Sequence, residues 1–349
     1  MNRRIHDISP WLVVLCLFGM PSCSKILVGE KIFLTAKSHF FAPTTKTVYS
    51  NETYTDGGDT YERIDWVDGD RIKLCVKNDD VTGASHVYAI DTPQPASRFS
   101  IAGLTPEGGN GLQWGNGTHY FWSAYPSTAT TGTYTVSGTY PEVQNLTFVG
   151  ETDGVLMYEP DMDYAYMVAG LKTDPTDDGI SLDFYPAMTT FEFTVRANDN
   201  LVITGFEMET NTAQSMGVSS GLDLSGTFVA TFDPADNMSY TFSNSGTTGH
   251  TLSANFSALA AISPTKSMRF KLFALPQDIT GVRLVFTLNN GTTRSLKLTT
   301  NTDQWITFSA CSLVRITGLL VPGAVWNIEM DGPRVQQWIV NSEIEIGVE

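Results

Sequence analysis

Few side chains in this sequence have the types and spacing that catalysis needs. Asp161 and Asp163 of "EPDMDYAY" lie two residues apart, and two carboxylates on one face of a strand suggest acid–base hydrolysis of a glycosidic bond. That chemistry requires a cleft between the carboxylates, which the sequence does not supply. The S-x-x-K letters of Ser263 to Lys266 require a helix, and Pro264 stands in a region without helical periodicity. A hydrolase therefore ranks last among the functional hypotheses.

Metal and cofactor sites are not indicated either. The histidines are scattered without the spacing of a zinc site: His6, His39, His86, His119 and His250. The aspartate clusters "DWVDGD" and "DPTDDG" do not match the calcium-loop pattern, and loop aspartates more often cap turns. We expect no metal, no cofactor and no catalytic residue.

The composition limits the partners of this chain. Its 349 residues carry a net charge of -16, and only 17% of them are charged. Phosphate binding needs clustered positive charge, so a nucleic-acid partner is not expected. With 42% hydrophobic residues the chain can form sizeable cores, and its length favours two domains over one large sandwich.

The first 23 residues have the pattern of an export signal. Arg3 and Arg4 precede the apolar run "WLVVLCLFGM", which is shorter than the roughly 20 residues of a membrane-spanning helix. Small residues then lead to Cys23, and "MPSC" is similar to a bacterial lipobox, which predicts lipidation of Cys23 and an exported lipoprotein of the outer membrane. Ordinary signal cleavage is the alternative. Cys75 and Cys311 remain for the folded part, and we expect both to be small strand residues.

Strand patterns recur along the chain. Apolar residues alternate in four segments: "RIKLCV" (71–76), "FEFTVRA" (191–197), "RLVFTL" (283–288) and "SLKL" (295–298). Asn290-Gly291 between the last two predicts a hairpin. Short strands separated by turns, without helical segments, indicate all-β antiparallel sandwiches. The polar segment "LKTDPTDDG" suggests a boundary near residue 176, which gives domains 24–176 and 177–349.

An aromatic cluster and the C-terminal segment suggest binding. In "HYFWSAYP", Phe121 and Tyr125 would share one strand face, and Tyr120 and Trp122 the other, so the cluster should divide between core and surface. Exposed aromatic rings would favour the alternative of a monomeric surface lipoprotein that binds glycans. The last residues, "EIEIGVE", alternate like a half-buried strand, which either closes its own sheet or pairs with another molecule.

Five segments in order resemble the fimbrillin family, the lipoprotein-derived subunits of donor-strand pili of certain Gram-negative anaerobes. They are "KTVYS" with "RIDWVDGDRIKL", "HYFWSAYP", "ISLDFYPAMTTFEFTV", "FKLFALPQDIT" and "RITGLLVPGAVWNIEMDGPRVQQWI". The resemblance implies two transthyretin-like β-sandwich domains and a non-enzymatic stalk or tip subunit of a cell-surface pilus that serves adhesion. It also implies other pilus subunits as partners, with a host or bacterial surface receptor.

The same resemblance implies donor-strand exchange. The strand that leaves would be "EKIFLTAK", with Ile32 and Leu34 on one face, and the donor would be residues 335–349 of the next subunit. The residues expected to fill the groove are Trp338, Ile339, Ile344, Ile346 and Val348.

The cleavage site departs from the family pattern. Stalk subunits usually carry an arginine in the loop after the first strand, and at that place this sequence has Lys46. The nearest arginine, Arg63, borders the segment "IDWVDGD". Either the protease accepts Lys46, or the subunit keeps its lipid anchor in the outer membrane and acts as an anchor or accessory component.

Overall fold

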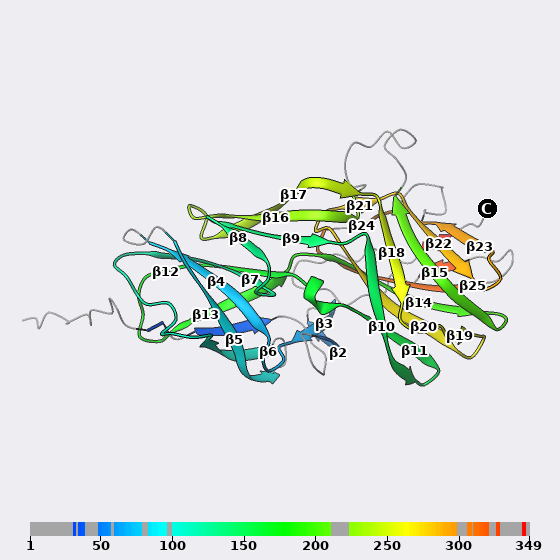
Figure 1. Ribbon diagram of the computed structural model, residues 1–349, viewed down its shortest axis with the longest axis horizontal. Coiled ribbons are helices and arrows are strands. Elements are labelled where there is room, and N and C mark those ends of the chain that lie inside the picture. Colours follow the sequence, from blue (N-terminus) through cyan, green and yellow to red (C-terminus); the bar gives the residue numbers. More distant parts are fainter. Residues whose placement is uncertain are drawn as a thin grey trace, which may run out of the picture.

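The computed structural model describes residues 31–32, 34–38, 48–56, 59–78, 83–95, 100–210, 223–298, 306–308, 310–320, 326–328 and 344–346. These residues form 27 strands and one short 3-10 helix, η1 (Met162–Tyr164). The all-β fold class is therefore confirmed. Figure 1 shows a barrel at one end of the long axis, a large sheet at the other end, and a smaller sheet along one side between them.

The first sheet is a closed barrel. Its strands follow the order β1 (Leu34–Ser38), β13 (Ile180–Pro186), β12 (Met167–Thr173), β7 (His119–Tyr125), β4 (Arg71–Lys77), β5 (Ala84–Pro95) and β6 (Ser100–Pro106). Alternate residues of each strand point inward, as in β4, where Ile72, Leu74 and Val76 are buried as predicted. The core of the barrel therefore receives side chains from every strand around it.

A four-stranded sheet covers one side of the barrel. It consists of β17 (Ser239–Gly249), β16 (Ser225–Asp233), β9 (Thr135–Tyr140) and β8 (Thr130–Gly132). The ring centroids of Tyr134 and Trp122 are 5.0 Å apart, and the Lys172 Nζ of β12 donates to the Pro234 carbonyl at 3.2 Å. Trp122 is consequently only 3% exposed. The prediction that the aromatic cluster divides between core and surface is therefore wrong for Trp122, because the four-stranded sheet covers its face of β7.

The ten-stranded sheet folds over its own core. Its order is β23 (Thr293–Lys297), β22 (Val282–Leu288), β15 (Leu201–Thr210), β18 (Thr251–Phe256), β10 (Val143–Thr152), β11 (Val155–Pro160), β20 (Ser267–Ala274), β14 (Thr189–Ala197) and β25 (Leu313–Leu320), and β19 (Ala261–Ile262) pairs with β15. Phe206 of β15 contacts Phe193 of β14, with ring centroids 4.7 Å apart. Strands distant in the sheet order thus face each other, as in a sandwich.

Three two-stranded sheets complete the described structure. They are β2 (Val48–Asp56) with β3 (Asp59–Asp65), β21 (Ile279–Thr280) with β24 (Thr307–Phe308), and β26 (Trp326–Ile328) with β27 (Ile344–Ile346). The hairpin predicted from Asn290-Gly291 is confirmed, because β22 and β23 pair antiparallel around it. Gly291 has a φ of 77°, a conformation that glycine adopts at little cost.

Strands from both halves of the sequence occur in the two large sheets. The β10–β11 hairpin, which precedes residue 176, pairs with β18 and β20, and β13, which follows residue 176, belongs to the barrel. Four strand pairs, including these two contacts of the hairpin, are parallel. The division into domains near residue 176 and the transthyretin-like topology stay predictions.

A row of charges crosses the second sheet. Glu192 of β14 is 5% exposed and lies between Lys271 of β20 at 3.1 Å and Arg315 of β25 at 2.9 Å. Burial alone would raise the pKa of the Glu192 carboxyl, but the charges of Lys271, Arg315 and Arg269 outweigh it and lower the pKa to about 2. The carboxylate is therefore ionised and paired across three strands.

Replacing Glu192 tests this pairing. We expect Glu192→Gln to lower the free energy of unfolding by about 3 kcal/mol at neutral pH, because the substitution removes the buried carboxylate that pairs with two partly buried cations. Since the folded pKa lies below the unfolded value of 4.5, the contribution of Glu192 is present above pH 4.5 and is lost as the pH falls towards 2. Urea unfolding between pH 7 and 2 measures both effects.

Glu142→Gln is the matched control, since Glu142 is exposed and immediately precedes β10 of the second sheet. It should leave both the stability and its pH dependence close to those of the original chain. If Glu192→Gln lost stability on acidification as steeply as the original chain, the paired carboxylate would not be the cause of the stability lost in acid.

Candidate functional site

The side chains considered for catalysis have structural roles. Asp161 precedes η1, and its Oδ1 accepts a hydrogen bond from the Asp163 backbone N–H at 3.0 Å. The two aspartates therefore do not share the face of a strand, and that expectation is wrong. Ser263 and Lys266 pair in a tight turn, and the Lys266 Nζ binds Glu151 at 2.8 Å. Within the described ranges, no group of three His, Cys, Asp or Glu side chains is placed to hold a metal ion.

The aspartates of "DWVDGD" shape a turn. Asp70 accepts a hydrogen bond from the Val67 backbone N–H at 3.0 Å and another from the Tyr125 hydroxyl at 3.2 Å. This arrangement is the turn cap expected of a loop aspartate. It also ties the turn before β4 to the end of β7.

The two cysteines of the folded part are free thiols. Cys75 lies in β4 and is buried, as expected. Cys311 lies in the turn before β25 with a φ of 51°, so its prediction as a strand residue is wrong. Burial, with a smaller effect of Asp278, raises the pKa of the Cys311 thiol to about 12, which leaves it protonated and unreactive at neutral pH.

The most distinctive feature of the barrel is the position of β1. Leu34 to Ser38 pair parallel with Ile180 to Phe184 of β13, and Thr35 to Ser38 pair antiparallel with Gly103 to Ser100 of β6. The strand is thus hydrogen-bonded on both sides. Without it, β6 and β13 would each expose an unpaired edge.

The inward side chains of this segment complete the barrel core. Ile32, Leu34 and Ala36 are 7%, 6% and 0% exposed and belong to the same cluster as Leu182 and Phe184 of β13. Burying a leucine or isoleucine contributes about 1.5–3 kcal/mol. The first strand therefore supplies both the backbone pairing that closes the barrel and part of its apolar core.

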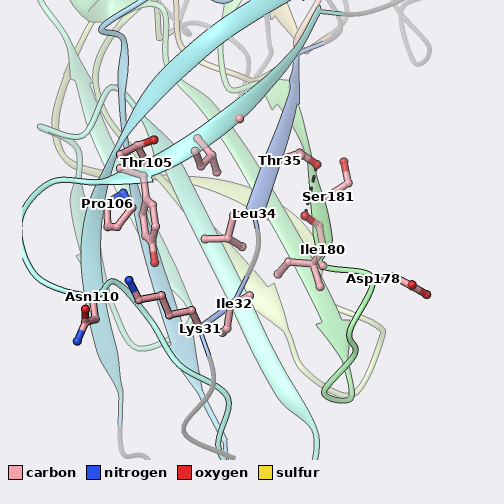
Figure 2. Close-up of a pocket in the computed structure, with 14 residues that line it drawn as sticks. Lys31, Ile32, Leu34, Thr35, Thr105, Pro106, Asn110, Asp178, Ile180 and Ser181 are labelled. Atoms are coloured by element: carbon pink, nitrogen blue, oxygen red, sulfur yellow. Dashed lines mark hydrogen bonds between the residues drawn. The ribbon is translucent and has the colours of Figure 1, made fainter. Parts of the chain in front are cut away.

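A cavity of about 520 Å³ lies beside the start of β1. Figure 2 shows Thr105 and Pro106 of β6 on one side of it and Ile180 and Ser181 of β13 on the other, with Leu34 between them. No sequence pattern indicated this cavity, because it depends on strands far apart in the chain. For example, the Thr35 hydroxyl of β1 donates to the Ile180 carbonyl of β13 at 3.4 Å, although the two residues are 145 positions apart in the sequence.

Some of the remaining predicted site residues lie within the described part of the chain and others lie outside it. Cys23, Lys46, Trp338, Ile339 and Val348 lie outside the described residues. Arg63 lies within β3. Ile344 and Ile346 lie in β27, which pairs antiparallel with β26 of the same chain. The roles predicted for all of these residues, and the removal of Ile32 and Leu34 with the first strand, stay predictions.

The described tryptophan side chains do not form a sugar-binding platform. Trp66, Trp114 and Trp122 are 2% to 3% exposed, and their indole rings pack against other aromatic side chains. The glycan-binding alternative expected an exposed row of such rings.

The described residues contain no helix of a length and apolarity that would cross a bilayer.

No protein-family model matches the sequence, and no curated protein matches it. Among solved structures, the chain is similar to a proposed cell adhesion protein from Bacteroides uniformis (TM-score 0.46, 15% identity, 83% of this chain and 93% of that chain). Another proposed cell adhesion protein, from Bacteroides ovatus, has a TM-score of 0.48 with 14% identity over 90% of this chain and 99% of that chain. A fimbrial assembly protein from Parabacteroides distasonis has a TM-score of 0.40 with 8% identity over 86% and 95%.

Truncating the first strand's largest inward side chain tests its contribution to the barrel. We expect Leu34→Ala to lower the free energy of unfolding by about 3 kcal/mol, because removing a buried leucine side chain leaves a cavity in the core. Leu259→Ala is the control, since Leu259 is 55% exposed, and it should change stability little. Equal small effects of the two substitutions in denaturant unfolding would show that β1 does not complete the core.

Proposed function

We propose that this protein is a structural subunit of a cell-surface filament that serves adhesion, in which β1 is replaced by a strand of another subunit. The observation that carries the proposal is the position of β1, which closes the barrel between β6 and β13 and buries Ile32, Leu34 and Ala36. The ordered sequence motifs that resemble fimbrillins support the same function.

The energetics of the position between β6 and β13 favour replacement of β1 by another strand over an empty groove. Loss of β1 would leave two unpaired strand edges and an exposed apolar groove, and both are unfavourable in water. An incoming strand with alternating apolar residues satisfies the backbone groups and refills the core together. Since such a strand is bonded along its whole length, it should dissociate very slowly, which suits a filament under force.

Release of β1 requires a break in the chain between β1 and β2. Residues 39–47 connect these strands, and Lys46 belongs to this segment. Arg63 instead lies within β3, whose backbone pairs with β2. A protease binds its substrate as an extended, unpaired segment, so we propose cleavage at Lys46 and not at Arg63.

The proposed donor is the segment 335–349. Its described part, β27, forms a pair of only three residues with β26. A two-stranded sheet of this size is marginal by itself. We propose that this pairing holds the segment within its own subunit until a neighbouring barrel accepts it, with Trp338, Ile339, Ile344, Ile346 and Val348 as groove-filling residues.

Lipidation of Cys23 would hold the subunit at the outer membrane before cleavage. An uncleaved subunit would stay there as an anchor, and a cleaved one would join other pilus subunits, with a surface receptor as the final partner. The alternative of a monomeric glycan-binding lipoprotein lacks a supporting aromatic row among the described side chains.

The assembly test compares three proteins treated with a trypsin-like protease and run unboiled on a denaturing gel. They are the chain from Cys23 onward, a deletion that ends at Arg334, and the Lys46→Gln variant. We expect a ladder of multimers only for the first, because the deletion lacks the donor and Lys46→Gln retains β1. A ladder from the deletion would contradict donation by residues 335–349, and a ladder from Lys46→Gln would contradict cleavage at Lys46.

A further inference from the structure

The pairing between β1 and β6 covers only part of either strand. It ends at Thr35 and Gly103, although β6 continues through Leu104 to Pro106, where β5 is its partner on the other side. The chain before Thr35 turns away from β6: the Ile32 N–H donates to the Leu112 carbonyl at 3.3 Å, and Lys31 pairs with Gln113. Among the described strands, none continues the pairing of Leu104–Pro106 on the β1 side.

The cavity lies where β1 and β6 separate. Its lining combines apolar side chains of the two strands with the first residues of β13, and Lys31 and Asp178 are its charged side chains. Figure 2 shows Lys31 on the same side as Asn110 and Pro106, and Asp178 on the opposite side near Ile180. The hydroxyl of Ser181, which also lines the cavity, is buried and has no hydrogen-bond partner among the described residues.

A loop closes this end of the barrel. Residues 107–118 connect β6 to β7, and within them the Leu112 N–H donates to the Tyr88 hydroxyl at 2.7 Å. The loop is fixed further along, where the Gly115 N–H donates to the His119 Nε2 at 2.9 Å and Trp114 packs edge-on against the same ring. Among the described residues, the loop pairs with Lys31 and Ile32, which precede β1, on one side only, in contrast to the two-sided ladder of residues 35–38.

The weakly paired end of β1 should therefore open before the rest. Local opening begins where few hydrogen bonds hold a segment, and Lys31 and Ile32 are paired on one side only. Opening at Lys31 and Ile32 enlarges an existing cavity and leaves the edge of Leu104–Pro106 accessible. An incoming strand can pair with that edge while residues 35–38 are still in place, so the barrel never has to expose its whole groove.

We propose that this cavity is the initial docking site for the C-terminal segment of a second copy of this chain, which rests on the proposed function. Main-chain pairing with Leu104–Pro106 would position the segment, and the cavity would take its alternate apolar residues, such as Ile344 and Ile346. The acidic side chains between them, Glu343 and Glu345, would then point out of the cavity towards solvent. The alternation of the segment thus fits the apolar part of the lining.

The experiment follows how fast a labelled peptide of residues 335–349 binds to the chain that has been cut after Lys46 and displaces the β1 fragment. Thr105→Trp and Asn110→Trp place a large ring at the cavity, and both positions are exposed, so the fold should be retained. Thr241→Trp on the exposed surface of β17 is the matched control. Circular dichroism and thermal unfolding verify that all four proteins are folded alike.

We expect the two cavity variants to bind the peptide about tenfold more slowly than the original chain, which is 1.4 kcal/mol in the activation barrier. Thr241→Trp should bind at the original rate, and the amount of peptide bound at the end should be equal for all. Equal rates in every protein would overturn the docking site while the proposed function stands. No binding to the original cut chain would overturn both.

Discussion

The barrel closes because one short strand hydrogen-bonds to two others at once. β1 lies between β13, which follows it by more than a hundred residues, and β6. The inward side chains of β1, the completeness of the first core and the cavity beside Leu34 all depend on this double pairing. A strand in such a position supplies both backbone pairing and part of the apolar core, so the barrel depends on it twice over.

Neighbouring segments of the chain contribute to different sheets. The β10–β11 hairpin is central in the second sheet, although β9, directly before it, packs on the barrel. From the second half of the chain, β16 and β17 cover β7 and β12 of the barrel. Tyr140 illustrates the result, because its hydroxyl donates to the Ala187 carbonyl at 2.6 Å and its ring packs on Phe228. The barrel is therefore supported from outside by strands that do not pair with β1.

Local patterns allowed the strands to be predicted, but not their neighbours. The alternation of "RIKLCV" and the Asn290-Gly291 turn act over a few residues, and both predictions are confirmed. Burial of Trp122 depends on a sheet that combines β8 and β9 with β16 and β17 from about a hundred residues further along the chain. The turn conformation of Cys311 depends on how β25 reaches β14, so local patterns did not reveal either feature. At the candidate site, alternation indicated that Ile32 and Leu34 share a face, whereas their partners and the cavity required the tertiary structure.

The directions of β6 and β13 have a consequence for any strand between them. β1 runs parallel to β13 and antiparallel to β6. A strand inserted the other way round would be antiparallel to β13 and parallel to β6, so it would again gain one ladder of each kind. Hydrogen bonding alone therefore does not choose the polarity of the insert. The side chains must therefore determine the direction of the inserted strand. That direction would in turn set how each molecule is oriented relative to the next.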